Sequence, residues 1–252
     1  MVPISVLIIA RNEERNIGDC IRSCSFAQDI LVVDDNSTDK TAEIAGSLGA
    51  RVLKRSMGSD FGAQQTFAIE NALFPWIFIV DADERCTQEL AEEIEAAITS
   101  NEQVAYLVRR KNRFQHNRAE HGVLRPDYAL RVMPVKGTFA KGQVHQEIVT
   151  PYPRRKMQGF MYHYTYADWQ HYFNKFNNYT TLAADKYKSQ GRKASFLVDI
   201  MLRPVWAFFK VYFLNLGFLD GKLGWILSVN HYFYTMNKYV KLYYLDKDDG
   251  KL

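Results

Sequence analysis

Polar side chains that can bind a metal ion and a phosphorylated ligand follow three apolar runs in the first half of the chain. The clusters are Arg11–Glu13, Asp34–Asn36 and Asp81–Asp83. Carboxylate oxygens are the ligands that Mg²⁺ and Mn²⁺ prefer, and such an ion bridges to phosphate oxygens and neutralises a departing diphosphate. The Asp-x-Asp pair Asp81 and Asp83 therefore predicts a metal site, with Mg²⁺ or Mn²⁺ as the cofactor.

The cluster that begins at Asp34 admits two interpretations. Asp34 or Asp35 can accept hydrogen bonds from a base or a ribose, as an acidic residue does in dinucleotide-binding folds. Alternatively, Ser37 or Thr38 caps the next helix whatever the function of the protein. Both can hold, with capping by Ser37 and ligand contact by Asp34 or Asp35.

Short apolar runs alternate with segments of helical spacing before these clusters, and this alternation predicts an α/β fold. Strands are expected at Ile4–Ala10, Ile30–Asp34, Arg51–Lys54 and Trp76–Val80, and helices within Asn12–Cys24, 37–48, Ala63–Ala72 and Thr87–Thr99. Such units build a parallel sheet whose ligand lies beyond the carboxyl ends of the strands. The three polar clusters are therefore expected to meet at one edge.

The second half is less regular. Strands are expected at Tyr106–Arg110, Tyr128–Met133 and Gln143–Thr150, and a long helix at Ala167–Ser189. In the aromatic segment Phe196–Leu245, the uncharged stretch near the middle, Val211–Leu219, has nine residues. A membrane-spanning helix needs about 20 apolar residues, so amphipathic helices at a membrane interface fit this segment better. A helical subdomain packed on the sheet is the alternative.

The 252 residues suit one large domain, alone or with an appended subdomain, and 47% hydrophobic residues exclude disorder. Residues 1–100 carry a net charge of −9 and residues 101–252 one of +13, and 24 of the 35 aromatic residues fall between Phe160 and Tyr244. A basic, aromatic second half suits an anionic surface.

Three cysteines make no disulfide framework, and we expect buried thiols. The sequence shows no signal peptide, so a cytoplasmic location is expected.

The segments Ile4–Glu14, Asp34–Asp39 and Asp81–Asp83 resemble, in order and spacing, the nucleotide-sugar half of glycosyltransferase family 2. The resemblance implies a GT-A fold (Rossmann-like, a mostly parallel sheet flanked by helices) and transfer with inversion at the anomeric carbon. It also implies that the first loop holds the nucleotide, that Asp35 or Asp34 contacts the base or ribose, and that the Asp-x-Asp binds the ribose-diphosphate and the ion. The donor-binding residues so implied are Ala10, Arg11, Asn12, Glu13, Asp34, Asp35, Asp81, Ala82 and Asp83.

Later motifs are similar to the branch of this family that contains lipopolysaccharide core β-glucosyltransferases. These motifs are Arg109-Arg110, Pro126–Val132, Val144-His145, His163–Tyr166, Phe218–Gly221 and Lys238–Leu242. The branch implies a UDP-hexose donor, typically UDP-glucose, and an inner-core lipopolysaccharide or lipooligosaccharide acceptor on the cytoplasmic face of the inner membrane. We expect a catalytic domain over residues 1–155, with its nucleotide half at 1–104 and its acceptor half at 105–155. A helical extension with membrane affinity would occupy residues 156–252.

The general base is the point at which this sequence departs from the branch. Members read Val-His-Glu there, whereas this chain reads Val144-His145-Gln146-Glu147. An amide is no base at a useful pKa, so Glu147 is the favoured catalytic base and His145 the alternative. Arg109, Arg110 and Arg131 can hold acceptor phosphates or the donor diphosphate, or they can pair with the acidic first half.

Other functions remain open on the sequence alone. Gln146 favours a nucleotide-sugar binder or membrane scaffold without turnover. A sugar-nucleotide pyrophosphorylase normally has a glycine-rich signature near its first strand, and Ile4–Glu14 contains no glycine. The cations of the second half are spread along apolar stretches, so no nucleic-acid partner is expected.

Overall fold

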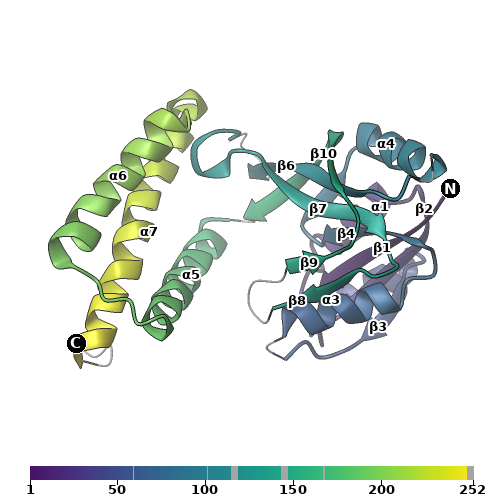
Figure 1. Ribbon diagram of the computed structural model, residues 1–252, viewed down its shortest axis with the longest axis horizontal. Coiled ribbons are helices and arrows are strands. Elements are labelled where there is room, and N and C mark those ends of the chain that lie inside the picture. Colours follow the sequence, from purple (N-terminus) through teal and green to yellow (C-terminus); the bar gives the residue numbers. More distant parts are fainter. Residues whose placement is uncertain (59, 101, 115–118, 143–146, 167, 249–252) are drawn as a thin grey trace. The chain divides into compact units, whose positions relative to one another are not determined.

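The computed structural model describes the chain except residues 59, 101, 115–118, 143–146, 167 and 249–252. The chain divides into two compact units (Figure 1). Unit 1 comprises residues 1–111 and 127–163, and unit 2 comprises residues 112–126 and 164–252. Strand β10 (Arg154–Tyr166) passes through residue 155, where the sequence places a domain boundary.

Unit 1 is built on an eight-stranded sheet with the order β3-β2-β1-β4-β7-β6-β10-β5. The parallel part comprises β3 (Arg51–Lys54), β2 (Ala27–Asp34), β1 (Val2–Ala10) and β4 (Trp76–Asp81). The remaining strands are β7 (Asp127–Pro134), β6 (Ala105–Phe114), β10 and β5 (Glu84–Cys86). Antiparallel pairs join β7 to β4, β6 to β7, and β5 to β10. The sheet is therefore mixed, and the expected parallel arrangement is confirmed for the first four predicted strands only.

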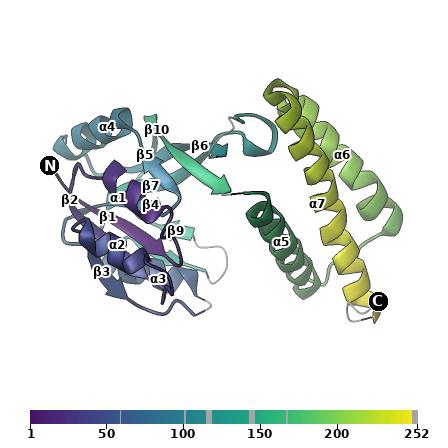
Figure 2. The same ribbon diagram turned by 180° about the vertical axis from the view of Figure 1, so that it is seen from behind.

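Helices cover both faces of the parallel strands (Figures 1 and 2). Helices α1 (Ile17–Ser23), α2 (Thr41–Ser47) and α4 (Gln88–Thr99) bury their apolar side chains with one face of the strands. Helix α3 (Phe61–Glu70) packs on the other face through Ala68 and Ile69. Alternate side chains of β1 enter the two cores, with Val6 and Ile8 in one and Leu7 in the other. This explains the continuous apolar run in the sequence.

A small second sheet lies against α3 and consists of β8 (Phe139–Lys141) and β9 (Glu147–Val149). The hydroxyl of Thr66 donates to the carbonyl of Ala140 at 2.9 Å and accepts from its amide at 3.0 Å. A Cβ on Gly62 would stand 2.9 Å from the carbonyl oxygen of Gly142. The close approach therefore requires glycine at position 62.

The helix start predicted near Ser37 is wrong. Helix α2 begins at Thr41, and its N-cap Lys40 makes no side-chain capping bond. The Ser37 hydroxyl instead accepts from the amide of Asn12 at 3.0 Å. A bond between loops thus replaces the local cap, because the two polar segments lie side by side at the sheet edge.

Unit 2 is helical apart from the end segments of β6 and β10. It contains η1 (Gly122–Leu124), α5 (Trp169–Ser189), η2 (Phe196–Leu202), α6 (Arg203–Phe209), η3 (Lys210–Leu214), η4 (Gly217–Asp220) and α7 (Gly221–Asp248). Helices α5 and α6 both pack against α7 (Figure 2). Asp220 accepts from the amide of His121 at 2.9 Å and lies 2.8 Å from its Nδ1. Within the described residues, no helix has the length and apolar character needed to span a membrane.

Candidate active site

The three polar clusters meet at one edge of the sheet in unit 1. Strand β1 lies between β2 and β4, with Ala10 opposite Asp34 and Ile9 opposite Asp81. Because all three strands are parallel, their carboxyl ends carry the clusters to the same place. The predicted convergence of these residues is confirmed.

The loop after β1 and the loop after β2 are joined by an ion pair and by hydrogen bonds. Arg11 Nη1 lies 3.3 Å from Asp35 Oδ2, and the amide of Glu13 donates to Thr41 Oγ1 at 2.7 Å. Asn12 has a φ of 56°, in the left-handed region that asparagine tolerates better than most residues. Its side-chain oxygen accepts from the amide of Thr38 at 2.8 Å. The two loops therefore form one polar surface rather than two separate turns.

Asp34 and Asp35, which the sequence left as alternatives, have different surroundings. Both oxygens of buried Asp35 are occupied, one by the amide of Met57 at 2.8 Å and the other by Arg11. Asp34 Oδ2 accepts from the amide of Ser37 at 3.2 Å. Its buried Oδ1 has no hydrogen-bond partner among the described residues. Asp34 therefore has the spare acceptor atom of the pair.

Asp81 belongs to a cluster of ion pairs around the buried side chains of Glu84 and Arg131. Arg131 Nη2 lies 2.5 Å from Asp81 Oδ2 and 2.6 Å from Glu84 Oε1. Arg110 Nη1 lies 3.5 Å from the same Glu84 oxygen and 4.0 Å from Asp81, and its guanidinium also pairs with Asp127. The Glu84 side chain is fully buried, and its Oε2 accepts from the amide of Asp81 at 2.9 Å. Two arginines from the antiparallel strands thus position the end of β4.

This cluster shifts the pKa values of Glu84 and Asp81 in opposite directions. Burial raises the pKa of Glu84, and the nearby charge of Arg131 offsets this only in part. Burial also acts to raise the pKa of Asp81, but the charge and hydrogen bond of Arg131 outweigh it and leave the pKa below its usual value. The ionised form of Asp81 is therefore the favoured one at the mouth of the site.

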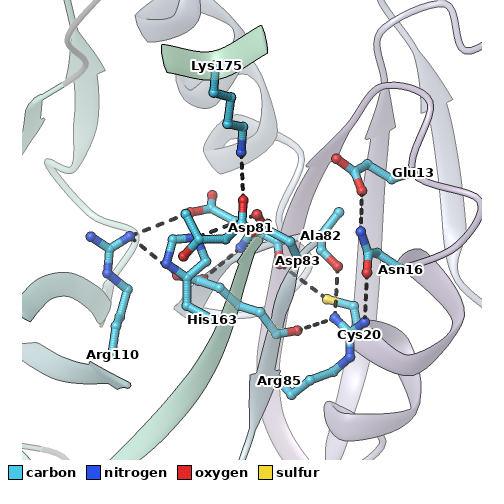
Figure 3. A network of polar contacts seen from close by, with 12 residues as sticks. Glu13, Asn16, Cys20, Asp81, Ala82, Asp83, Arg85, Arg110, His163 and Lys175 are labelled. Carbon is cyan, nitrogen blue, oxygen red and sulfur yellow. Dashed lines mark hydrogen bonds and ion pairs between the residues drawn. The ribbon is translucent and has the colours of Figure 1, made fainter. Parts of the chain in front are cut away.

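The other residues of the Asp-x-Asp segment are held by a second network. Asp83 Oδ2 lies 3.5 Å from His163 Nε2. The carbonyl of Ala82 accepts from Arg85 Nη1 at 2.9 Å, and Arg85 Nη2 donates to Asn16 Oδ1 at 3.3 Å. Figure 3 shows this network, in which Asn16 continues to Glu13 of the first loop. The backbone at Ala82 is thereby fixed relative to the first loop.

The donor atoms at this edge fit a hard divalent cation. The Asp81 side chain is 46% exposed and that of Asp83 is 19% exposed, so both can be reached by a ligand. Among the described residues, no group of three or more His, Cys, Asp or Glu side chains is arranged to enclose a metal. Mg²⁺ is commonly bound by one or two carboxylates together with substrate phosphates and water. The two carboxylates Asp81 and Asp83 supply ligands of that kind.

A cavity of about 410 Å³ has both Asp81 and Glu147 in its lining. It is lined by Gln65, Ile79, Asp81, Leu107, Arg110, Tyr128, Ala129, Leu130, Arg131, Glu147, Ile148 and Arg154. Its walls therefore bring together the predicted metal ligand, two of the predicted arginines and the predicted base. Gln65, Glu84 and Arg154 were not singled out from the sequence. Of these three, only Glu84 could have been found from the sequence, because it is an acidic residue directly after Asp-x-Asp.

The remaining predicted residues are placed as follows. Glu147 on β9 is 64% exposed, and its Oε2 lies 3.4 Å from Lys141 Nζ. Arg109 is exposed, and it precedes Arg110 on β6, so the alternation of a strand turns it to the other face, away from the cavity. His145, the alternative base, and Gln146 lie outside the described residues.

The cysteines are buried and free, as predicted. A hydrogen bond with Cys24 and burial raise the pKa of Cys20, and burial raises that of Cys86. Both thiols are therefore held in the neutral, unreactive form.

Comparison with known sequences adds a family to this geometry. The family described as Glycosyl transferase family 2 matches residues 5–184. The chain is 28% identical over 256 residues to an uncharacterized glycosyltransferase of Rickettsia prowazekii, covering 96% of this chain and 87% of that protein. It is 27% identical over 250 residues to the lipopolysaccharide core biosynthesis glycosyltransferase LpsC of Rhizobium meliloti, covering 96% and 92% of the two chains.

Among solved structures, the chain is similar to residues 1–349 of S. aureus TarS in complex with UDP. The TM-score is 0.51 at 14% sequence identity, and the match covers 99% of this chain and 92% of that one. At this identity the likeness shows the fold, which is a mixed sheet flanked by helices.

Proposed function

Because the chain belongs to glycosyl transferase family 2, we propose that it transfers a hexose from a UDP-sugar to a lipopolysaccharide core acceptor. The observation that carries the proposal is the cavity that has both Asp81 and Glu147 in its lining. Transfer of a sugar needs a group that stabilises the leaving diphosphate on one side of the sugar. It also needs a base for the attacking hydroxyl on the other side. The relative LpsC, named for lipopolysaccharide core biosynthesis, supports the class of acceptor. TarS, whose structure contains UDP, supports the nucleotide.

In this proposal the nucleotide lies across the carboxyl ends of β1 and β2. The spare oxygen of Asp34 accepts a hydrogen bond from the base or ribose, while Asp35 holds Arg11 and the loop. Asp81 and Asp83 would hold Mg²⁺ or Mn²⁺, and the ion would supply positive charge to stabilise a departing diphosphate. Arg131 and Glu84 fix the direction of the Asp81 carboxylate, so that little reorganisation is needed when the ligand binds.

Glu147 is the proposed general base. Its carboxylate takes the proton of the acceptor hydroxyl as that oxygen forms a bond to the anomeric carbon. The bond between this carbon and the β-phosphate oxygen breaks on the opposite face, and its electron pair leaves with the diphosphate. The configuration at the anomeric carbon is therefore inverted. Lys141 Nζ lies 3.4 Å from Glu147 Oε2.

We further propose that unit 2 binds the cytoplasmic face of the inner membrane, where a lipid-linked acceptor is found. Large apolar side chains on η2, α6 and η3 are exposed, among them Leu197, Trp206 and Leu214 at 64%, 58% and 58%. Exposed cations, including Arg203 and Lys210, occur in the same segment. This pairing of apolar and cationic side chains is typical of helices that lie at a lipid interface.

Transfer of labelled glucose from UDP-glucose to lipooligosaccharide with a truncated inner core tests the proposal. Glu147→Gln should lower kcat by about 10²–10⁴-fold, because only proton transfer is lost, and should leave the KM for UDP-glucose nearly unchanged. The matched control is Glu95→Gln, which changes an exposed glutamate on α4 and should retain full activity.

An unchanged rate in Glu147→Gln would remove Glu147 as the base. Binding of UDP-glucose without transfer by the unmodified protein would favour a nucleotide-sugar binder instead.

A further inference from the structure

Gln65 is a buried residue whose side-chain nitrogen makes no hydrogen bond within the part of the chain that the structure describes. The residue lies on α3 and is 2% exposed. Its Nε2 has no hydrogen-bond partner among the described residues. A buried amide without a partner lowers stability, so a position of this kind calls for an explanation.

The neighbouring Gln64 shows what a structural glutamine on this helix does. Gln64 is also buried, but its Nε2 donates to the carbonyl of Arg55 at 2.8 Å. Its Oε1 accepts from Arg55 Nη1 at 2.9 Å. Gln64 therefore joins α3 to the segment after β3 with both polar atoms. Gln65 Nε2 makes no comparable bond to any described residue.

Gln65 lines the cavity that also contains Asp81, Glu147 and Arg131. In that lining, Arg131 and Arg110 are already paired with Asp81, Glu84 and Asp127. Gln65 contributes an uncharged group that can both donate and accept. A sugar hydroxyl has the same dual capacity, so an amide is well matched to it.

We propose that the terminal amide of Gln65 is a specificity-determining group that hydrogen-bonds a hydroxyl of a hexose bound in this cavity. The inference rests on the proposed glycosyl transfer and names a residue that reads the sugar. Rotation about the terminal torsion of Gln65 is soft and brings either polar atom toward the ligand. The hydroxyl belongs to the transferred hexose or to the accepting sugar, which share this chemistry.

The test is Gln65→Met, which keeps the length of the side chain and removes its polar atoms. The variant should have a higher Tm than the unmodified protein, because a buried amide without a partner is replaced by an apolar group. Its kcat/KM should nevertheless fall by about tenfold or more, since the hydrogen bond to the sugar is lost. A gain in stability together with a loss of activity is not expected of a merely structural residue.

Two sets of substrates distinguish the sources of the hydroxyl. UDP-glucose is compared with UDP-deoxyglucose analogues, and the truncated lipooligosaccharide with its deoxy forms. The unmodified protein should discriminate against the one analogue that lacks the hydroxyl, and Gln65→Met should lose that discrimination. Loss of discrimination among the UDP-sugars assigns the contact to the donor. Loss of discrimination among the lipooligosaccharides assigns it to the acceptor.

Gln64→Met is the matched control, and it should lower the Tm while preserving discrimination. A lower Tm in Gln65→Met, or unchanged discrimination in both sets, would overturn the inference while transfer by the unmodified protein persists. Absence of transfer by the unmodified protein would overturn the proposed function, and the inference with it.

Discussion

Single residues at the end of β4 are controlled by charges from distant parts of the sequence. Asp81 and Glu84 meet Arg131 of β7 and Arg110 of β6. The sequence predicted Asp81 and Asp83, because this pair follows an apolar run and occurs in order and spacing with the two other polar clusters. Pairing of Arg131 and Arg110 with the acidic first half was one of two predicted alternatives. The sequence did not identify which acids they meet, because strand order β4-β7-β6 depends on pairing between distant segments. Gln65 was missed for a similar reason, since nothing in a helical sequence marks an amide that lacks a partner.

Replacing Arg131 should destabilise the protein in a pH-dependent manner. Arg131→Met leaves Glu84 buried without its closest cation and should lower the free energy of unfolding by about 3–5 kcal/mol at pH 7. The pKa of Glu84 is raised, so its ionised form costs stability as the pH rises, and more so without Arg131. Arg131 lowers the pKa of Asp81 below its usual value of 3.8. The stability that this ion pair contributes is therefore present above pH 3.8 and is lost on acidification. Both effects make the difference between variant and unmodified protein shrink as the pH falls.

Urea unfolding of both proteins between pH 7 and pH 4 measures this difference. Arg154→Met serves as the control, because Arg154 lines the same cavity but is exposed and has no ion-pair partner among the described residues. A difference that stays constant with pH would show that Arg131 acts through packing rather than charge.

Elements were predicted well where periodicity is strong and poorly where tertiary contacts decide. Strand Arg51–Lys54 has the predicted bounds, and α4 begins within one residue of the predicted start. Strand β10 was missed, although its buried Met157, Gly159 and Met161 alternate. A Cβ on Gly159 would stand 2.6 Å from Leu90 Cα, so this strand needs glycine where β-propensity disfavours it. Helix packing against the strand, rather than local preference, explains its position.

The exposed apolar face of α6 and η3 leads to a prediction about lipid binding. Trp206, Phe209 and Phe213 form successive ring contacts, with centroids 5.7 Å and 5.1 Å apart, and all are exposed. Replacing the three with serine should weaken binding to phosphatidylglycerol vesicles about hundredfold, because each half-exposed ring contributes about 1 kcal/mol on burial. Co-sedimentation measures the binding, and added salt should weaken it through the cations of this segment.

Leu73→Ser provides a matched control, since Leu73 of unit 1 is 64% exposed but lies outside the aromatic segment. Equal weakening by Leu73→Ser, or full vesicle binding by the triple variant, would contradict a membrane role for α6 and η3.

At the scale of the whole molecule, the two halves of the sequence differ in charge, from −9 over residues 1–100 to +13 over residues 101–252. The acidic half supplies the parallel strands and all three polar clusters. The basic half supplies Arg110, Arg131 and the aromatic helices. The family was predictable because the clusters keep their order and spacing along the chain. The general base stays a prediction. A single inserted position near Gln146 changes which side chain of the strand faces the site, so the sequence leaves both Glu147 and His145 as candidates.

The most direct test of the central claim is calorimetric titration of the full chain with UDP-glucose, GDP-mannose and dTDP-glucose, with and without Mn²⁺. We expect binding of the UDP-sugar that depends on Mn²⁺ and is lost in Asp83→Ala, while the circular dichroism of that variant is unchanged. Equal binding of UDP-glucose with and without Mn²⁺, or in Asp83→Ala, would contradict the metal-assisted donor site. Absence of binding to all three nucleotide sugars would contradict the proposed transferase.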